Sequence, residues 1–208
     1  MVTIMISELL INTILQLILF SIIPVLWWFF SARKKEPLFS WLGLTVPKFV
    51  SSSKAILVFL LSLGPLLALG IYLILSFEDR SVLAQAKFAQ LGIGGIVPIL
   101  IYAVFQTGLS EEIFFRGFLN KRLSNKFGFA IGNTVQAVLF GSVHGLLLFG
   151  SLQISLILLI VAFTAATGWL MGFLNEKLSG GSIIPSWTIH SLANIIPAVL
   201  IAFGVIAV

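Results

Sequence analysis

The sequence predicts an all-α fold, a polytopic membrane helical bundle of about six transmembrane helices, and two observations support this prediction. First, 59% of the 208 residues are hydrophobic, only 9% are charged, and the mean hydropathy is +1.15. A soluble domain of this size needs more charges to cover its surface. Second, the charges gather between long apolar runs, which is the pattern of spans and loops. We expect residues 1–208 to form a single membrane domain.

The first three spans are predicted from runs with almost no charge. The run 1–30 carries only Glu8 and ends in four aromatic residues, which are typical of a membrane interface. Because this run is long and lacks a basic start, we expect a retained helix and not a signal peptide. The run 55–77 predicts a second helix, and the run 88–110 predicts a third that continues through two glutamates to residue 122.

The last three spans follow from one long run and one short run. Residues 127–175 carry no formal charge apart from one histidine, and this run is too long for one helix because about 20 residues cross a bilayer. A break near Gly150 predicts two helices, 128–148 and 152–174. The final run, 183–208, predicts the sixth helix.

The loop charges predict the orientation of the chain. Basic residues gather in the first, third and fifth loops, namely Arg33, Lys34, Lys35, Lys48, Lys54, Lys121, Arg122, Lys126 and Lys177. The positive-inside rule therefore places these loops in the cytoplasm and both termini outside. We expect an integral membrane protein of a bacterial plasma membrane, with the lipid bilayer as its surroundings. Basic residues grouped in this way, between apolar flanks, exclude a nucleic-acid groove.

The two histidines of the chain, His144 and His190, both fall inside predicted spans. Each has a partner four residues away, on the same face of its helix. Phe140 lies one turn before His144, and Asn194 lies one turn after His190. Polar groups inside a span are costly and usually mark function.

Two adjacent glutamates, Glu111 and Glu112, lie at the end of the third apolar run. Arg116 is four residues after Glu112, so we predict that these two pair and share the cost of burying a charge. Glu111 is rotated by about 100° on the helix and faces a different partner. This difference makes Glu111 the better candidate for a base.

Small and amide side chains predict how the helices pack. Gly141-x-x-x-Gly145 and Gly168-x-x-x-Gly172 indicate close contact between two helices. Asn133, Gln136 and Gln106 are expected to form hydrogen bonds between helices or to line a pocket.

Helical geometry predicts the depth of the polar residues. At ~1.5 Å per residue, Glu111 lies about 15 Å from the basic cluster that follows it, and His190 and Asn194 lie about 10–17 Å from the start of the last span. These depths predict a site in the cytoplasmic half of the bilayer that opens toward the cytoplasm. His144 would lie roughly 24 Å deep if its helix began where the apolar run begins. We therefore expect that helix to begin later, near Gly132.

Three motifs thus occur in order, each within its own span: Glu111-Glu112-x-x-x-Arg116, Phe140-x-x-x-His144 and His190-x-x-x-Asn194. Their order and spacing resemble those of the CAAX protease and bacteriocin-processing (CPBP, or Abi) family of intramembrane glutamic-type endopeptidases. The resemblance covers about residues 100–194, which form the expected catalytic core. Eukaryotic members have eight spans, so their prenylated substrates are not carried over to this chain.

The resemblance implies an intramembrane endopeptidase that cleaves a membrane-associated protein or peptide without a cofactor. Glu111 would activate water with help from His144. His190 and Asn194 would stabilise the oxyanion, and Glu112 with Arg116 would support the site.

Zinc held by Glu111, His144 and His190 is an alternative that the residue types leave open. The absence of an H-E-x-x-H motif and the glutamate dependence of the family favour the reading without metal. Other protease classes are excluded by composition. The one aspartate, Asp79, lies in a loop, no G-x-S-G motif occurs, and the chain has no cysteine.

Two further functions compete with proteolysis. A non-catalytic binding, scaffold or immunity protein of the same family could retain the fold. A small transporter could use a glutamate to carry protons. The complete set of motifs favours the protease, because a scaffold does not need all six polar residues.

Overall fold

The computed structural model describes residues 2–76, 80 and 83–208, and it confirms the predicted all-α membrane fold. Six helices are long and apolar enough to cross a membrane: Thr3–Ser31, Ser52–Ser76, Gly92–Phe127, Phe129–Leu147, Ile154–Leu178 and Ile184–Ala202. Their order agrees with the six apolar runs of the sequence.

The first two spans are α1 (Val2–Ser31) and α3 (Ser52–Ser76), with the short α2 (Leu38–Leu42) between them. A 3₁₀ turn, η2 (Ala86–Phe88), precedes the third span. The third span is built from six consecutive helical segments: η3 (Gly92–Gly95), α4 (Ile96–Leu100), η4 (Ile101–Leu109), α5 (Ser110–Glu112), η5 (Ile113–Asn120) and α6 (Lys121–Phe127). The last three spans are α7 (Phe129–Leu147), α8 (Ile154–Phe173) with η6 (Leu174–Leu178), and α9 (Ile184–Ala202).

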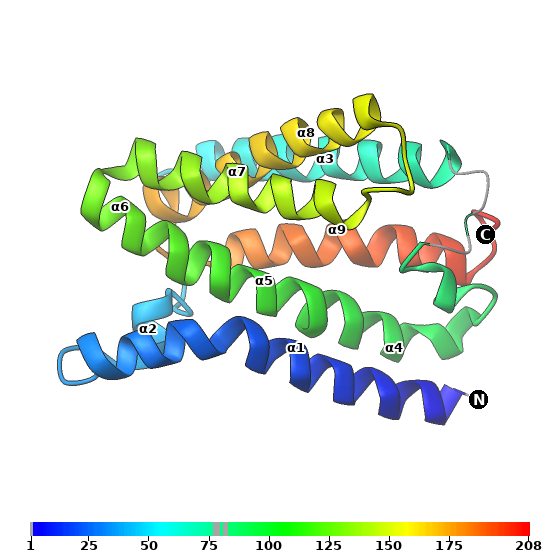
Figure 1. Ribbon diagram of the computed structural model, residues 1–208, viewed down its shortest axis with the longest axis horizontal. Helices are drawn as coiled ribbons and strands as arrows, with labels where there is room; N and C mark the ends of the chain where they lie inside the picture. The colour runs from blue at the N-terminus through cyan, green and yellow to red at the C-terminus, as the bar shows by residue number, and fades with distance from the viewer. Residues whose placement is uncertain (1, 77–79, 81–82) are drawn as a thin grey trace.

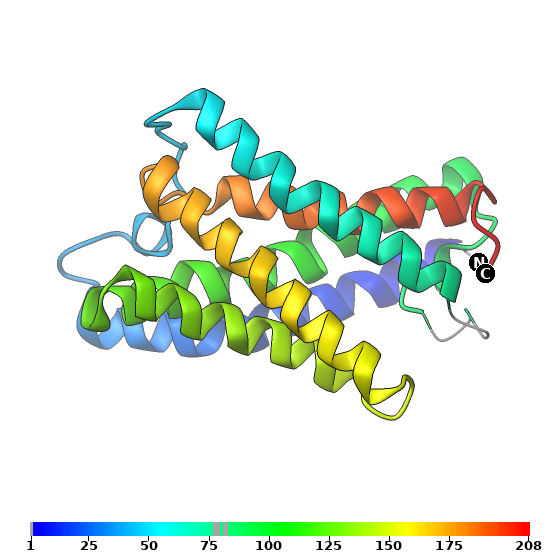
Figure 2. The same cartoon turned by 90° about the horizontal axis from the view of Figure 1, so that it is seen from above.

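The spans surround α9 and the third span (Figure 1). On one side, α1 runs along the third span, and on the other side α3 and α8 pack against α9, while α7 packs against α8 and the third span. Seen from above, α3 and α8 run obliquely to α9 (Figure 2). Both chain termini lie at the same end of the bundle, as an even number of spans requires.

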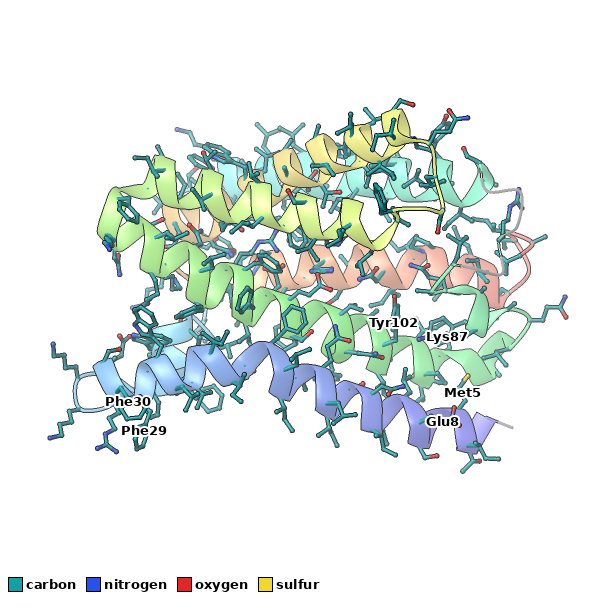
Figure 3. The ribbon with its side chains drawn as sticks, in the orientation of Figure 1. Met5, Glu8, Phe29, Phe30, Lys87 and Tyr102 are labelled. Carbon is teal, nitrogen blue, oxygen red and sulfur yellow. The ribbon has the colours of Figure 1, made fainter. Side chains whose placement is uncertain are left out.

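The two ends of the bundle differ in charge, and we name them for what they contain. The basic end comprises residues 32–54, 121–128 and 174–183. The terminal end comprises residues 83–95 and 148–153 together with the two chain termini. Side chains of Phe29 and Phe30 lie toward the basic end, whereas those of Met5, Glu8, Lys87 and Tyr102 lie in the half near the termini (Figure 3).

The third span is longer than the sequence analysis predicted, and this corrects the expected start of the fourth helix. The third helix continues to Phe127, Gly128 turns the chain with a positive φ of 86°, and α7 begins at Phe129 and not near Gly132. Glu111 and His144 then lie about 24 Å and about 22 Å from this turn, by helical rise. The apparent mismatch in depth therefore disappears because the third helix continues past its basic residues.

Close contact between α7 and α8 follows the glycines, as predicted. A Cβ atom on Gly141 would meet the backbone oxygen of Val161, and a Cβ on Gly172 would meet the side-chain amide of Asn133. Asn133 also donates from Nδ2 to the backbone oxygen of Trp169 at 2.9 Å. Gln136 donates to the backbone oxygen of Gly168 at 3.1 Å. These bonds confirm the expected role of the amides, because backbone oxygens inside a bilayer cannot bond to water.

Large apolar side chains cover the outside of the bundle. Leu15, Ile18 and Leu19 on α1 are more than half exposed, at 59%, 57% and 68%. A soluble surface does not carry a continuous stripe of this kind. The stripe is therefore suited to contact with lipid tails.

Candidate active site

Three spans bring all six predicted site residues together. Glu111 and Glu112 lie on α5, Arg116 follows on η5, and His144 lies on α7, while His190 and Asn194 lie on α9. The segments on either side of α5 are π-helices, which occur frequently at functional sites.

Glu112 and Arg116 form the predicted ion pair. Arg116 Nη1 lies 2.8 Å from Glu112 Oε1, and both side chains are fully buried. The Ser186 hydroxyl donates to Oε2 of the same carboxylate, and His190 Nδ1 lies 3.2 Å from its Oε1. Three donors thus satisfy one buried carboxylate, which offsets the cost of its desolvation.

Phe140 connects the pair to the histidines. Its ring lies 4.0 Å from the Arg116 guanidinium carbon and 4.5 Å, between centroids, from the His144 imidazole. A third contact, at 5.9 Å, places the His190 ring at its edge. The single ring of Phe140 therefore contacts Arg116, His144 and His190 and helps to hold them in position.

Glu111 faces both histidines and not His144 alone, which the sequence did not indicate. Its Oε2 atom lies 3.8 Å from His190 Nε2 and 4.0 Å from His144 Nε2. This oxygen is buried and has no hydrogen-bond partner in the structure. Glu111 is thus the less constrained of the two glutamates, as predicted. Separations of this size are too long for direct hydrogen bonds but fit a bridging water.

The backbone fixes the tautomer of His144. Its Nδ1 atom lies 2.9 Å from the carbonyl oxygen of Phe140, and a carbonyl can only accept. The ring proton therefore sits on Nδ1, and in the neutral ring Nε2 presents its lone pair toward Glu111.

His190 is held in a similar way by a carboxylate. Its Nδ1 faces Glu112, whose negative charge is paired with Arg116, so Nδ1 carries a proton here too. A hydrogen-bond donor role for Nε2 therefore requires the imidazolium form of His190.

Thr107 and Ser186 lie near the site and were not among the residues predicted from the sequence. Asn194 Nδ2 donates to Thr107 Oγ1 at 3.1 Å, and Asn175 Nδ2 donates to Ser186 Oγ at 2.7 Å. Thr107 precedes Glu111 by four residues, and Ser186 precedes His190 by four. The four-residue spacing that linked the motif residues could therefore have found both, had it been applied toward the N-terminus.

A cavity of about 490 Å³ lies against these groups. It is lined by polar and apolar residues from five parts of the chain, including Gln16, Tyr102, Thr107, Glu111, His144, His190 and Asn194. A cavity of about 240 Å³ shares His144, His190 and Asn194 and extends toward the second half of α3. Beside the first cavity, the Lys87 ammonium lies 4.2 Å from the Tyr102 ring centre, and partial burial lowers the pKa of Lys87.

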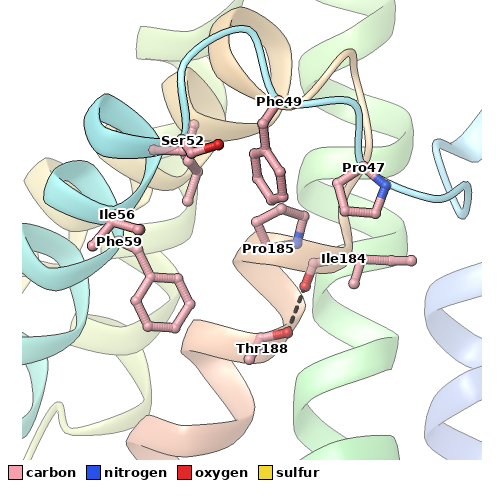
Figure 4. Close-up of a pocket in the computed structure, with 10 residues that line it drawn as sticks. Pro47, Phe49, Ser52, Ile56, Phe59, Ile184, Pro185 and Thr188 are labelled. Carbon is pink, nitrogen blue, oxygen red and sulfur yellow. Dashed lines mark hydrogen bonds between the residues drawn. The ribbon is translucent and has the colours of Figure 1, made fainter.

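A separate cavity of about 320 Å³ contains none of the six site residues. It lies where α3 and α9 begin, and Figure 4 shows Phe49, Phe59 and Pro185 around it. The hydrogen bond drawn there, from Thr188 Oγ1 to the Ile184 oxygen at 2.9 Å, lies within α9. Its lining residues are mostly apolar, with the hydroxyls of Ser52 and Thr188, and they include no carboxylate or imidazole to act as a base.

Zinc ligation by Glu111, His144 and His190 would need shorter separations between the ligand atoms than this arrangement has. Bonds of ~2.1 Å in a tetrahedron would bring ligand atoms to roughly 3.4 Å from one another. The observed separations from Glu111 are 3.8 and 4.0 Å. Within the described ranges 2–76, 80 and 83–208, no group of three His, Cys, Asp or Glu side chains could hold a metal ion.

Together, the fold and the site define a polytopic helical membrane protein in which carboxylate, imidazole and amide groups converge inside the bundle. Residues 93–196 match the model of the family described as type II CAAX prenyl endopeptidase Rce1-like, and the chain belongs to this family. No curated protein and no solved structure matches the chain. The matched range contains all six site residues, and the family indicates a CAAX-type intramembrane endopeptidase.

Proposed function

We propose that this protein hydrolyses a peptide bond of a membrane-associated protein or peptide, with Glu111 as the general base. One observation carries the proposal: the buried, unbonded Oε2 atom of Glu111 lies 3.8 and 4.0 Å from the Nε2 atoms of two histidines. A water molecule in this gap would contact a base and be oriented at the same time.

The reaction follows from the donors and acceptors of this gap. Glu111 takes one proton from the water, while the lone pair on His144 Nε2 accepts the second hydrogen and orients the oxygen. The oxygen attacks the carbonyl carbon of the substrate, a C–O bond forms, and the carbonyl electron pair moves onto its oxygen. Glu111 then passes its proton to the nitrogen as the C–N bond breaks.

His190 and Asn194 would stabilise the oxyanion. The Asn194 amide gives one N–H to Thr107 and keeps a second for the substrate. His190 would donate from Nε2 as an imidazolium, whose charge is compensated by the carboxylates of Glu111 and Glu112. Donors that are positioned before the reaction usually supply a large share of catalysis.

Cleavage assays on reconstituted protein test the proposal. We would incubate proteoliposomes with a library of membrane peptides and identify the products by mass spectrometry. We expect Glu111→Ala and His144→Ala to reduce cleavage on the order of 10²–10⁴-fold. Glu36→Gln, an exposed acid at the basic end, is the matched control and keeps full activity.

Two outcomes of the same assay would favour other functions. Full cleavage by both alanine variants, or no cleavage by the wild type of any peptide that it binds, would favour a non-catalytic binding protein. Loss of wild-type cleavage with a strong chelator, restored by added zinc, would favour the metal-dependent alternative. We expect cleavage to continue in the chelator.

A further inference from the structure

We propose that the active-site cavity opens at the non-cytoplasmic face of the membrane, so that apolar peptide segments reach Glu111 from that side. The identification of the occupant as a substrate rests on the proposed function. The direction of access depends on geometry and charge alone.

The walls of the site cavity lead from Glu111 to the terminal end. Beyond His144 the lining continues through Leu147 and Leu148 to Ser151, in the connection between α7 and α8. On the other side it continues through Ala84 and Gln85, before the third span. His144 lies three residues before the end of α7, and a third of its side chain is exposed (33%). The site is therefore reached from the terminal end.

The opposite side of the site is closed by buried polar groups. Glu112, Arg116 and Asn120 follow Glu111 toward the basic end, and each is fully buried. Asn175 on η6 and Ser186 on α9 are also fully buried on this side of the site, and a hydrogen bond of 2.7 Å joins them. These buried side chains therefore lie between Glu111 and the basic end of the bundle.

Loops at the basic end add a second closure. Backbone hydrogen bonds join the first loop to the fifth, from Lys48 to Ser179 at 3.2 Å and from Val50 to Leu178 at 3.0 Å. Lys121 Nζ lies 2.7 Å from Glu176 Oε1 and bonds the backbone oxygen of Gly181 at 2.6 Å. These contacts tie three loops together over the end of the bundle.

The distribution of charge assigns the closed end to the cytoplasm. Apart from Arg80, Lys87 and the buried Arg116, all of the chain's 12 lysines and arginines lie at the basic end. Such an excess in short loops marks the cytoplasmic side. In this fold, cytoplasmic basic loops and a site that opens toward the cytoplasm are incompatible. The positive-inside rule depends only on the loop charges and not on the shape of the cavity. We therefore assign the basic loops to the cytoplasm and the cavity opening to the non-cytoplasmic face.

The lining of the mouth indicates what enters it. The cavity of about 240 Å³ beside the catalytic groups runs between α3 and α8, where Leu69 and Leu73 face Ile160 and Thr164. Apolar walls with a few polar groups at one end suit an apolar side chain next to a peptide bond. A membrane-associated peptide in the outer leaflet has this chemistry, and a soluble charged peptide does not.

Single cysteines test the direction of access, because the natural chain contains none. We would introduce Ser151→Cys at the terminal end and Lys34→Cys at the basic end, and treat intact cells with a membrane-impermeant maleimide. We expect Ser151→Cys to react in intact cells and Lys34→Cys to react only after permeabilisation. The reverse pattern would overturn the proposal and place the mouth in the cytoplasm.

A second pair of variants tests the cavity itself. Ala193 lines the inner cavity beside Asn194, whereas Ala198 on the same helix is fully buried. We expect a small charged thiol reagent, added to intact cells, to modify Ala193→Cys and to leave Ala198→Cys unmodified. An unreactive Ala193→Cys in cells where Ser151→Cys reacts would show that the cavity is not open to that face. These labelling results do not depend on cleavage, so failure of the access proposal and failure of the protease proposal are distinguishable.

Discussion

His190 Nδ1 lies 3.2 Å from Glu112 Oε1, the oxygen that also accepts the hydrogen bond from Arg116 at 2.8 Å. One buried carboxylate therefore fixes both an arginine on its own helix and a histidine on a helix 78 residues further along the chain. In the proposed mechanism Glu112 is a positioning residue, because it would act on the substrate through His190. Its neighbour Glu111 has no such partner, so the two glutamates should respond differently to mutation.

Replacement of Glu112 should damage the fold. In Glu112→Gln the Arg116 guanidinium stays fully buried without its counter-charge, and breaking a buried pair in this way costs about 3–5 kcal/mol. We expect a lower thermal unfolding temperature in detergent and a loss of cleavage. The double variant Glu112→Leu, Arg116→Met should recover much of the stability but none of the activity. An unchanged unfolding temperature in Glu112→Gln would contradict this role.

Replacement of Glu111 should spare the fold. In Glu111→Gln the side chain keeps its size, and the lost carboxylate charge satisfied no hydrogen bond at Oε2. We expect cleavage to fall on the order of 10²–10⁴-fold, with the unfolding temperature close to that of the wild type. The two measurements together separate a base from a structural charge. A loss of stability as large as that of Glu112→Gln would argue against the assignment.

Thr107 should tune the rate through Asn194. Thr107→Val removes the acceptor at 3.1 Å that orients the Asn194 amide, and one such bond is worth about 1 kcal/mol. We expect kcat to fall about five- to tenfold with little change in KM, because the oxyanion exists only after attack. Thr107→Ser keeps the hydroxyl and should retain the wild-type rate. Equal kcat values for the valine and wild-type proteins would remove Thr107 from the site.

Two glycines should show opposite effects of one added methyl group. A Cβ on Gly172 would collide with the Asn133 amide between α7 and α8, whereas a Cβ on Gly64 in α3 would meet no atom within 4 Å. Overpacking costs about 1–3 kcal/mol, and an unhindered Gly→Ala change in a helix gains about 0.5–1 kcal/mol. We expect Gly172→Ala to lower the unfolding temperature and Gly64→Ala to raise it. Equal shifts would show that α7 and α8 are not packed as described.

Local patterns in the sequence were enough for the spans and for contacts within one helix. Six apolar runs correspond to the six helices, because a helix in a bilayer must satisfy its own backbone and present apolar side chains to lipid. The Glu112–Arg116 pair followed from a spacing of four residues, since neighbours on one helical face meet whatever surrounds them. Three such spacings in order indicated the family, and the match of residues 93–196 to the family model confirms it.

Contacts between helices were decided only by the tertiary structure. The position of Glu111 between both histidines and the Ser186 bond to Glu112 depend on how α7 and α9 pack against the third span. The direction in which the cavity opens depends on the same packing. A spacing along the chain fixes rotation about one helix axis, but the relative height and facing of two helices depend on the side chains that fill the space between them.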